Sequence, residues 1–297
     1  MKQKKVPSNS GKISLNDLKD VRQVEYHGDT LPDDEAIALK VSEAGFTFDF
    51  LWRPAPSRNA LFVFFSGDAI RSKNDPPVFQ RWSWARHFPG NCLFVSDPSL
   101  YLDKGLGLAW YGGTSRIDPL DIISRVIRRI CDQKRIPIAN VFSYGSSGGG
   151  FAALRLLTVI EEMGAIAINP QTVVTNYRNG MVEKYLRVCF GGLSRQEALD
   201  QYPERLSLLH HIEALKRRRI IYLQNVQDEH HYDVHYLPFC KAMGCDPEAN
   251  ESDGNFRRLL FAHEGGHAKA ETPEVFAKAM QIAFSSDPAP SNWTEFG

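Results

Sequence analysis

The chain has 297 residues and a mass of 33.5 kDa, a size that suits one α/β domain carrying an insertion. Lysine plus arginine and aspartate plus glutamate both number 35, so the formal net charge is zero and gives no reason to expect a nucleic-acid partner. No stretch of about 18 apolar residues is present, which excludes a membrane-spanning helix. Five cysteines without a CxxC pair, and a basic N-terminus with no apolar segment behind it, predict a reduced, cytoplasmic protein.

The hydrophobic patterns divide the chain into three parts. Residues 1–35 form an N-terminal tail and lead-in, residues 36–285 an α/β domain, and residues 286–297 a C-terminal tail. At the start of the domain, alternating apolar residues at 36–41 and 46–52 predict a β-hairpin at the edge of a sheet. Strand and helix patterns alternate through the rest of the domain, so we expect a mostly parallel sheet flanked by helices.

Continuous apolar runs at 61–65 and 92–95 predict strands that are buried on both faces. The first of these strands ends at Ser66, Gly67 and Asp68. A polar loop that contains glycine, directly after an inner strand, is where an oxyanion hole is usually completed. We therefore expect a backbone N–H group near Gly67 or Asp68 to serve as an oxyanion donor.

Aromatic residues gather in two connecting segments that come next in the chain. Residues 75–90 are aromatic and basic without a clear period, and either pack as a connecting helix or line the rim of a site. Residues 105–113 have glycines at both ends and Trp110 and Tyr111 between them, which predicts a substrate-facing loop. These two rings suit stacking on sugar rings, although core packing explains them equally well. Apolar residues at helical spacing then predict a helix over 118–132.

Residues 140–157 carry the most informative motif of the chain. A short β-branched and aromatic run is followed by GSSGG at 145–149 and then by an apolar, alanine-rich helix. This strand, turn and helix match G-x-S-x-G, in which the glycines are needed because a Cβ would strike the neighbouring strand or helix. We predict that Ser147 is a nucleophile and that the N–H of Gly148 is an oxyanion donor. A phosphate-binding loop would instead require Lys and Ser or Thr where Phe151 follows.

The second half of the domain predicts a cap and two further strands. After a short strand at 165–168, residues 172–219 show short helical patterns without strands between them. We interpret this segment as a small helical cap inserted above the sheet, where substrate choice is usually determined. Buried-strand patterns return at 220–224 and 259–262.

A serine nucleophile needs a base to take its proton and an acid to orient that base. In folds built around such an elbow the acid follows the serine in the chain and the histidine comes last, each after a strand. Asp228 lies four residues beyond the strand at 220–224 and is the predicted acid. Asp233 and Glu229 are the alternatives.

The base is expected after the strand at 259–262, where two histidines lie. We prefer His267 because Gly265 and Gly266 let its loop fold back over the sheet edge, whereas His263 lies nearly in the strand. The segment also matches the zinc motif H-E-x-x-H, which requires a helix. Two consecutive glycines would destabilise such a helix by about 2 kcal/mol, so we expect no metal here.

No cofactor and no metal are predicted elsewhere. A second group of histidines with an aspartate could assemble a metal site, but we interpret it as a polar loop that faces the active-site cleft: His230, His231, His235 and Asp233.

Taken together, these features resemble the α/β-hydrolase superfamily over roughly residues 62–284. More narrowly, the chain resembles a bacterial branch that includes capsular-polysaccharide and accessory-secretion O-acetyltransferases. The motifs that carry this resemblance are FSGD at 65–68, SDPSL at 96–100, WYGG at 110–113, GSSGGGFAAL at 145–154, INPQT at 168–172 and QDEHH at 227–231. The resemblance implies the same nucleophile, acid, base and oxyanion donors: Ser147, Asp228, His267, Gly67 with Asp68, and Gly148. Gly148 departs from the commonest bacterial form, which has a larger residue after the serine.

The predicted function is serine-dependent acyl transfer through an acyl-enzyme. The acceptor is either water, as in an esterase, or a sugar hydroxyl, as in an O-acetyltransferase that acts on a bacterial glycan. Acetyl-CoA is a candidate acyl donor, and the expected partner is a small-molecule or glycan ester. The alternative is a non-catalytic binding module on a hydrolase scaffold, which an ordered set of Ser, Asp and His argues against.

Overall fold

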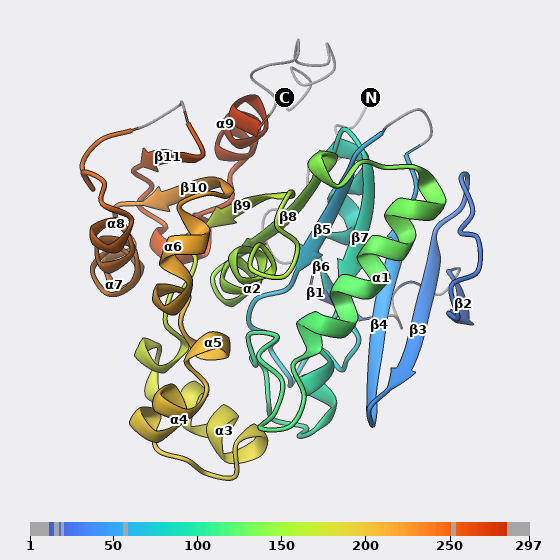
Figure 1. Cartoon of the computed structure of the whole chain (residues 1–297), viewed down its shortest axis with the longest axis horizontal. Helices are drawn as coiled ribbons and strands as arrows, with labels where there is room; N and C mark the ends of the chain where they lie inside the picture. The colour runs from blue at the N-terminus through green and yellow to red at the C-terminus, as the bar shows by residue number, and fades with distance from the viewer. Residues whose placement is uncertain (1–11, 15–17, 19–20, 56–58, 251–253, 284–297) are drawn as a thin grey trace.

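The computed structural model describes residues 12–14, 18, 21–55, 59–250 and 254–283. Its central element is a twisted sheet, in which the described residues form nine strands in the order β11-β10-β9-β8-β5-β7-β4-β3-β2 (Figure 1). The strands are β2 (Arg22–Glu25), β3 (Ile37–Glu43), β4 (Phe46–Arg53), β5 (Leu61–Phe65), β7 (Asn91–Val95), β8 (Val141–Ser146), β9 (Gly164–Ile168), β10 (Arg219–Asn225) and β11 (Phe256–Phe261).

The six strands from β11 to β7 are parallel, which confirms the expected mostly parallel sheet. β3 and β4 form the predicted antiparallel hairpin, and β4 pairs antiparallel with β7. The lead-in before residue 36 adds β2, which pairs in parallel with β3 at the sheet edge. A small second sheet pairs β1 (Lys12–Ser14) with β6 (Val78–Gln80).

Each inner strand buries side chains on both faces of the sheet, as its continuous apolar pattern predicts. In β5, Leu61, Val63 and Phe65 belong to one hydrophobic cluster, whereas Phe62 and Phe64 belong to the other. Helices α1 (Pro119–Lys134) and α2 (Gly148–Leu156) contribute to the first cluster, and α9 (Pro273–Ala283) contributes to the second. Full burial of each large apolar side chain stabilises the fold by about 1.5–3 kcal/mol.

The predicted helix at 118–132 is α1, and its first turn shows why it begins where it does. Asp118 precedes the helix and its side chain accepts a hydrogen bond from the N–H of Leu120 at 3.1 Å. Pro119 occupies the first helical position, where its missing N–H has no internal partner to lose. Two further helices, α8 (Leu237–Met243) and α9, follow β10 and β11.

Between β9 and β10 the chain forms a group of short helices at one end of the sheet (Figure 1). They are α3 (Asn179–Cys189), α4 (Arg195–Gln201), α5 (Pro203–Leu206) and α6 (Ile212–Leu215). Arg155 of α2 joins this group to the domain, because its buried guanidinium donates to the carbonyl of Glu204 at 3.1 Å and pairs with Asp118. This segment corresponds to the predicted helical cap.

The aromatic segment at 75–90 packs into the core. After β6 it forms a 3₁₀ helix, Trp82–His87, in place of the expected connecting α-helix. Trp82 and Trp84 pack against the hydrophobic cluster that also contains α9. Core packing, the first of the two interpretations, therefore accounts for these tryptophans.

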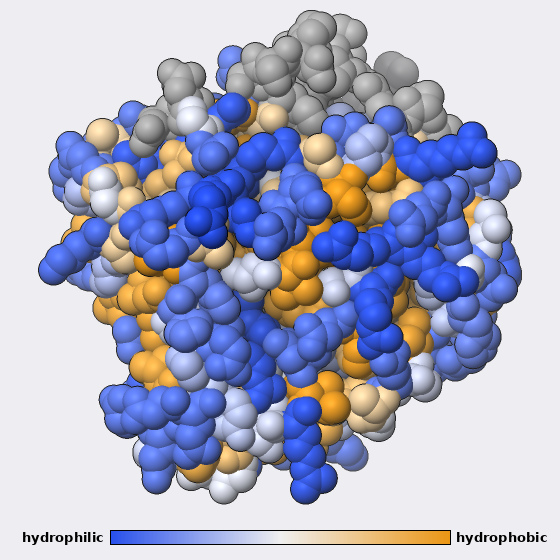
Figure 2. All heavy atoms as spheres, in the orientation of Figure 1, coloured by the Kyte–Doolittle hydropathy of each residue, from blue (hydrophilic) through white to orange (hydrophobic). Residues whose placement is uncertain are grey.

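The outer surface is mixed in character. Figure 2 shows hydrophobic residues as small patches that hydrophilic side chains separate, on the face that Figure 1 presents. Within the ranges that the structure describes, no helix combines the length and the apolar character that crossing a membrane requires.

The turn between β8 and α2 is too closely packed for side chains. A Cβ on Gly145 would collide with the backbone of Gly149, and a Cβ on Gly149 would collide with the carbonyl of Phe65 in β5. Both neighbours are backbone atoms, which cannot rotate away. The two outer glycines of the GSSGG motif are therefore required by the approach of β5 and α2.

We expect Gly149→Ala to lower the free energy of unfolding by about 1–3 kcal/mol, because overpacking forces the backbone of β5 or α2 to shift. Gly180→Ala in α3 is the matched control, since a Cβ there meets nothing within 4 Å. Alanine is a better helix former than glycine, so the control is expected to be neutral or up to about 1 kcal/mol more stable. Urea unfolding measures both, and equal stabilities for the two variants would contradict this account.

Candidate active site

Ser147 lies at the sharp turn that joins β8 to α2. Its backbone has φ 55° and ψ −123°, a conformation that a residue with a Cβ rarely adopts. Three backbone hydrogen bonds stabilise this strained conformation. The N–H of Ser147 donates to Ile168 O at 3.1 Å, and the carbonyl of Ser147 accepts from Phe151 N at 3.1 Å and from Gln171 N at 3.2 Å. This is the geometry that the G-x-S-x-G motif predicts.

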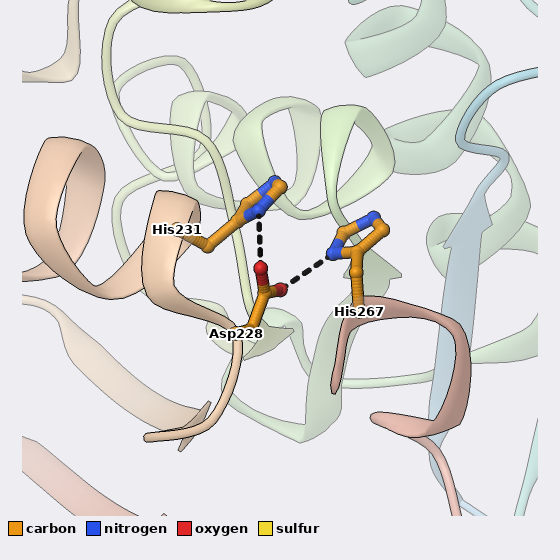
Figure 3. Close-up of side chains that lie close together, drawn as sticks. All are labelled: Asp228, His231 and His267. Carbon is orange, nitrogen blue, oxygen red and sulfur yellow. Dashed lines mark hydrogen bonds and ion pairs between the residues drawn. The ribbon is translucent and has the colours of Figure 1, made fainter. Parts of the chain in front are cut away.

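The loops after β10 and β11 bring an acid and a histidine together (Figure 3). Asp228 precedes α7 (Glu229–His231), and His267 lies in the 3₁₀ helix Gly266–Lys269. His267 Nδ1 and Asp228 Oδ2 are 2.7 Å apart, a short and strong hydrogen bond. Of the three candidate acids, Asp228 is therefore the one that contacts His267.

The Asp228 carboxylate has a dense set of donors. Oδ2 accepts from Asn169 Nδ2 at 2.8 Å in addition to His267, and Oδ1 accepts from His231 Nδ1 at 3.1 Å. Burial of this carboxyl group acts to raise its pKa, but the hydrogen bonds from His231 and His267 outweigh burial. The pKa of Asp228 consequently lies well below its usual value, and the group is ionised at neutral pH.

Asn225, the last residue of β10, fixes the loop that carries His267. Its Nδ2 donates to His263 O at 2.9 Å and to Gly266 O at 3.0 Å. Its Oδ1 accepts from His263 N at 3.0 Å and from Gln227 N at 3.1 Å. The fully buried amide of Asn225 thus joins the loop that carries Asp228 to the loop that carries His267. The backbone of His263 takes part in this contact, so His263 has a structural role.

Gln171 lies beside Ser147 and was not among the predicted site residues. Its Nε2 donates to Ser147 Oγ at 3.1 Å. Tyr177 is a further neighbour: burial raises the pKa of its hydroxyl, while a hydrogen bond with Ser147 acts in the opposite direction. Among the described residues no hydrogen bond joins Ser147 to His267, whose side chain is 34% exposed. Catalytic hydrogen bonds are often completed only when substrate is bound.

The predicted oxyanion donors Gly67 and Gly148 differ in whether their N–H group already has an acceptor. The N–H of Gly67 donates to Gln80 Oε1 at 2.9 Å, and Gln80 Nε2 donates to Asp68 O at 3.0 Å. Gln80 therefore holds the peptide group between residues 66 and 67 and the one between residues 68 and 69 in fixed orientations. Gly148 is the first residue of α2, a position whose N–H has no acceptor within its own helix.

Trp110 and Tyr111 are fully buried, so neither ring is presented to a ligand in this structure. Trp110 Nε1 donates to Gln171 Oε1. The Tyr111 hydroxyl donates to Val95 O at 2.7 Å and accepts from Ser66 N at 2.9 Å. These contacts support the loops around Ser147, and we do not propose either residue as a direct ligand contact.

Asp228, His231 and His267 are also a group that could hold a metal ion, since one ligand atom from each lies within 4.8 Å of the others. The 2.7 Å separation between His267 Nδ1 and Asp228 Oδ2 is that of an N–H···O bond. Two ligands about 2.0–2.2 Å from a tetrahedral zinc would lie farther apart than this. His235, a member of the histidine group that we interpreted as a polar loop, uses its Nδ1 to accept from Thr172 N at 3.2 Å.

Sequence reasoning missed Asn169, Gln171 and Asn225, and it placed His231 only in a polar loop. Asn169 and Gln171 belong to the INPQT segment directly after β9, and Asn225 ends β10. Polar residues at the carboxyl ends of inner strands were a usable signal, since loops there gather at one sheet edge. Which of them contact Ser147 or Asp228 depends on side-chain directions that the sequence does not contain.

We expect Asn225→Ala to lower the free energy of unfolding by about 1–3 kcal/mol, because it leaves buried backbone groups of the His263 loop unpaired. It should also weaken the signal of the His267 Nδ1 proton in NMR spectra by loosening that loop. Asn140→Ala is the control, since the Asn140 side chain makes one exposed hydrogen bond, to Asn59 O at 2.9 Å. An unchanged histidine proton signal in Asn225→Ala would argue against the loop-fixing role.

Two buried histidines predict how stability changes with pH. Burial lowers the pKa of His231 to about 4 and that of His235 to about 3, from an ordinary value of 6.5. Below pH 6.5 the unfolded chain therefore binds protons that the folded chain does not. The stabilisation is fully present above that pH and decreases as the pH falls toward 4, by on the order of 1–3 kcal/mol per histidine.

His235→Phe is accordingly expected to lose less stability than wild type between about pH 7.5 and about pH 5 in urea unfolding. Burial raises the pKa of Asp97 to about 6, which acts in the opposite sense, but this contribution is common to both proteins and cancels. The exposed His210 provides the control His210→Phe. Identical pH-dependent losses in wild type and His235→Phe would show that this histidine is not the source.

Known proteins match this chain in structure but not in sequence. No protein-family model matches the chain, and no curated protein matches it. The capsule O-acetyltransferase of Neisseria meningitidis serogroup A is similar in structure, with a TM-score of 0.56 at 15% identity, over 82% of this chain and 95% of that one. MPT51 of Mycobacterium tuberculosis gives a TM-score of 0.57 at 12% identity, over 87% and 98% of the two chains.

An acylaminoacyl peptidase from Pyrococcus horikoshii has a TM-score of 0.58 at 12% identity, over 86% of this chain and 42% of that one. These proteins are similar to this chain in overall structure while sharing few residues with it. At such low identity the similarity concerns the fold. The chain has the α/β-hydrolase fold, as the resemblance in its sequence implied.

Proposed function

We propose that this protein is a serine-dependent acyl-transfer enzyme. The observation that carries the proposal is the strained backbone of Ser147, at an elbow whose neighbouring loops carry the hydrogen-bonded pair Asp228 and His267. A strained φ at a serine is maintained only where surrounding contacts enforce it, and such strain is concentrated at functional sites. A purely structural turn would have no use for an ionised acid and a histidine beside it.

In the proposed reaction Asp228 fixes the tautomer of His267. His267 keeps its proton on Nδ1, where the N–H donates a hydrogen bond to the carboxylate, so Nε2 carries the lone pair that accepts the proton of Ser147. Ser147 Oγ then forms a bond to the carbonyl carbon of an ester or thioester. The electron pair of the C=O bond moves to oxygen and gives a tetrahedral oxyanion.

Backbone N–H groups of Gly148 and Asp68 are the proposed oxyanion donors. Gly148 begins α2, so its N–H points from the helix N-terminus, where negative charge is favoured. Asp68 lies in the loop that Gln80 holds. Since the N–H of Gly67 donates to Gln80, Gly67 would act through the shape of this loop. Removal of one oxyanion donor typically costs about 3–4 kcal/mol in the transition state.

Collapse of the tetrahedral species breaks the bond to the leaving group, which takes the proton from His267, and leaves an acyl group on Ser147. An acceptor hydroxyl then gives its proton to His267 and attacks the acyl carbon. The bond between that carbon and Ser147 Oγ breaks, and Oγ takes the proton back from His267, which regenerates Ser147. Water as acceptor makes the protein an esterase, and a sugar hydroxyl makes it an O-acyltransferase. The triad chemistry is the same in both cases.

We favour a glycan hydroxyl as acceptor and acetyl-CoA as donor. This choice is supported by the motif resemblance and by the structural similarity to the Neisseria capsule O-acetyltransferase, a variant of which is described in complex with CoA. A second candidate function, a non-catalytic binding module, would need the site to be incomplete. Here the serine follows β8, the acid follows β10 and the histidine follows β11, three parallel strands of one sheet.

Acyl-enzyme trapping tests the proposal. Wild type and Ser147→Ala are incubated with p-nitrophenyl acetate or with acetyl-CoA, and added acetyl groups are located by mass spectrometry. We expect acetylation at Ser147 in wild type and its loss in Ser147→Ala, with turnover reduced at least about 10³-fold. Ser143→Ala is the matched control. Ser143 is a buried serine of β8, the strand that leads to Ser147, and its hydroxyl donates to Ala153 O at 2.8 Å.

The decay of the acetyl group separates the two acceptors. Faster discharge by oligosaccharide than by water identifies an O-acetyltransferase, and rapid discharge by water alone identifies an esterase. A folded wild-type protein that gains no acetyl group from either donor would favour the binding module.

A further inference from the structure

Asp228 binds two histidines, and the proposed reaction uses only one of them. His231 lies one turn into the segment that Asp228 begins, and its Nδ1 is 3.1 Å from Asp228 Oδ1. The rings of His231 and His267 are stacked, with centroids 4.1 Å apart and planes inclined by 15° (Figure 3). His231 is 1% exposed, so it has no access to solvent of its own.

The protonation state of His231 follows from its burial. Burial lowers its pKa to about 4, against the opposing effect of the Asp228 carboxylate, so the ring is neutral at neutral pH. A neutral imidazole has one N–H, and the contact with Asp228 assigns it to Nδ1. Nε2 is therefore an acceptor, and Gln171 Nε2 lies 3.5 Å from it, at the outer limit of hydrogen-bond distance.

The amide of Gln171 has only one orientation that satisfies its neighbours. Oε1 accepts from the indole N–H of Trp110, which can only donate. This leaves the two N–H bonds of Nε2 for Ser147 Oγ at 3.1 Å and for His231 Nε2. Gln171 is fully buried, so no water competes for these positions.

We propose that His231 and Gln171 form a positioning relay through which Asp228 orients the nucleophile Ser147 as well as the base His267. The relay rests on the proposed function, because it assigns a role in serine catalysis. Asp228 holds His231, His231 holds the amide of Gln171, and that amide donates to Ser147 Oγ. Since Oγ then acts as an acceptor toward Gln171, its own proton is directed elsewhere, and His267 is the base proposed to receive it.

The position of Gln171 in the sheet argues against a role as oxyanion donor. Gln171 follows β9, which lies on the side of β8 that leads to β10 and β11 and hence to Asp228 and His267. The loop with Asp68 follows β5, on the opposite side of β8. Gln171 thus lies with the acid and the base, and its effect on the reaction runs through the orientation of Ser147.

Gln171→Glu is the most informative variant, because it keeps the shape of the side chain and replaces the N–H donor by a carboxylate. The ionised carboxylate would accept the Ser147 proton in competition with His267. We expect kcat for p-nitrophenyl acetate to fall about 10- to 100-fold at neutral pH, with KM changed less than about 3-fold. Gln133→Glu is the matched control, because Gln133 is a half-buried glutamine of α1 whose Nε2 donates to Gly28 O instead of to Ser147; its kcat is expected to match wild type.

The pH profile separates this role from a merely structural one. Protonation of the introduced carboxyl group restores an O–H donor, so the ratio of wild-type to variant kcat should become smaller as the pH falls toward about 5. The titratable groups around this position are His231, Asp228, His230, His235, His267 and Tyr177, which are the same in both proteins.

His231→Phe tests the other half of the relay, since phenylalanine keeps a ring against His267 and removes both nitrogens. We expect a loss of about 10-fold in kcat. If the two residues act as one unit, the double variant should be no worse than Gln171→Glu alone. A double variant whose losses multiply would overturn the relay, as would single variants with wild-type kcat at every pH.

Two measurements keep the outcomes distinct. Ser147→Ala in the same assay tests the proposed function: full activity there would overturn both proposals, whereas inactivity with normal Gln171→Glu and His231→Phe variants would overturn the relay alone. If a variant does not fold, ¹⁵N NMR of wild-type histidine rings decides. A neutral, Nδ1-protonated His231 at neutral pH is expected, and the Nε2-protonated or charged form would overturn the relay.

Discussion

A carboxylate buried in a protein must be surrounded by hydrogen-bond donors. The hydrogen bonds to the buried carboxylate of Asp228 bring the segments of this site together. Three side chains from three different segments meet its two oxygens: Asn169 after β9, His231 on α7 and His267 after β11. Without these donors burial would raise the pKa of the carboxyl group and neutralise it. The donors keep Asp228 charged, and the charge in turn holds the donors in place.

The second constraint is steric and concerns the elbow at Ser147. The approach of β5 and the first turn of α2 leaves room only for glycine at two positions, and it forces a positive φ on the serine between them. Buried polar contacts hold this strained turn. Arg81 donates to Ser146 Oγ at 2.5 Å and pairs with Glu271 at 2.5 Å, which links the residue before Ser147 to the segment before α9.

The parts of the site that could be predicted are those encoded by local patterns. The elbow is a contiguous motif, and the strands at 61–65 and 92–95 were visible as continuous apolar runs and coincide with β5 and β7. The environment of Trp110 could not be predicted from a local pattern. An aromatic residue between glycines fits an exposed loop as well as a core, and only the packing of the cap and α2 around it makes it a buried partner of Gln171.

The sequence by itself determined the α/β alternation, the elbow at Ser147 and the order in which Ser147, Asp228 and His267 follow their strands, because each depends on neighbours within a few residues or on the succession of strands. The tertiary structure decided which acid contacts His267, the engagement of Gly67 by Gln80, and the contacts of Gln171 with Ser147 and His231. These are contacts between residues 13 to 60 positions apart. They depend on the order in which β5, β8, β9, β10 and β11 lie in the sheet, and on side-chain directions that only the packed core fixes.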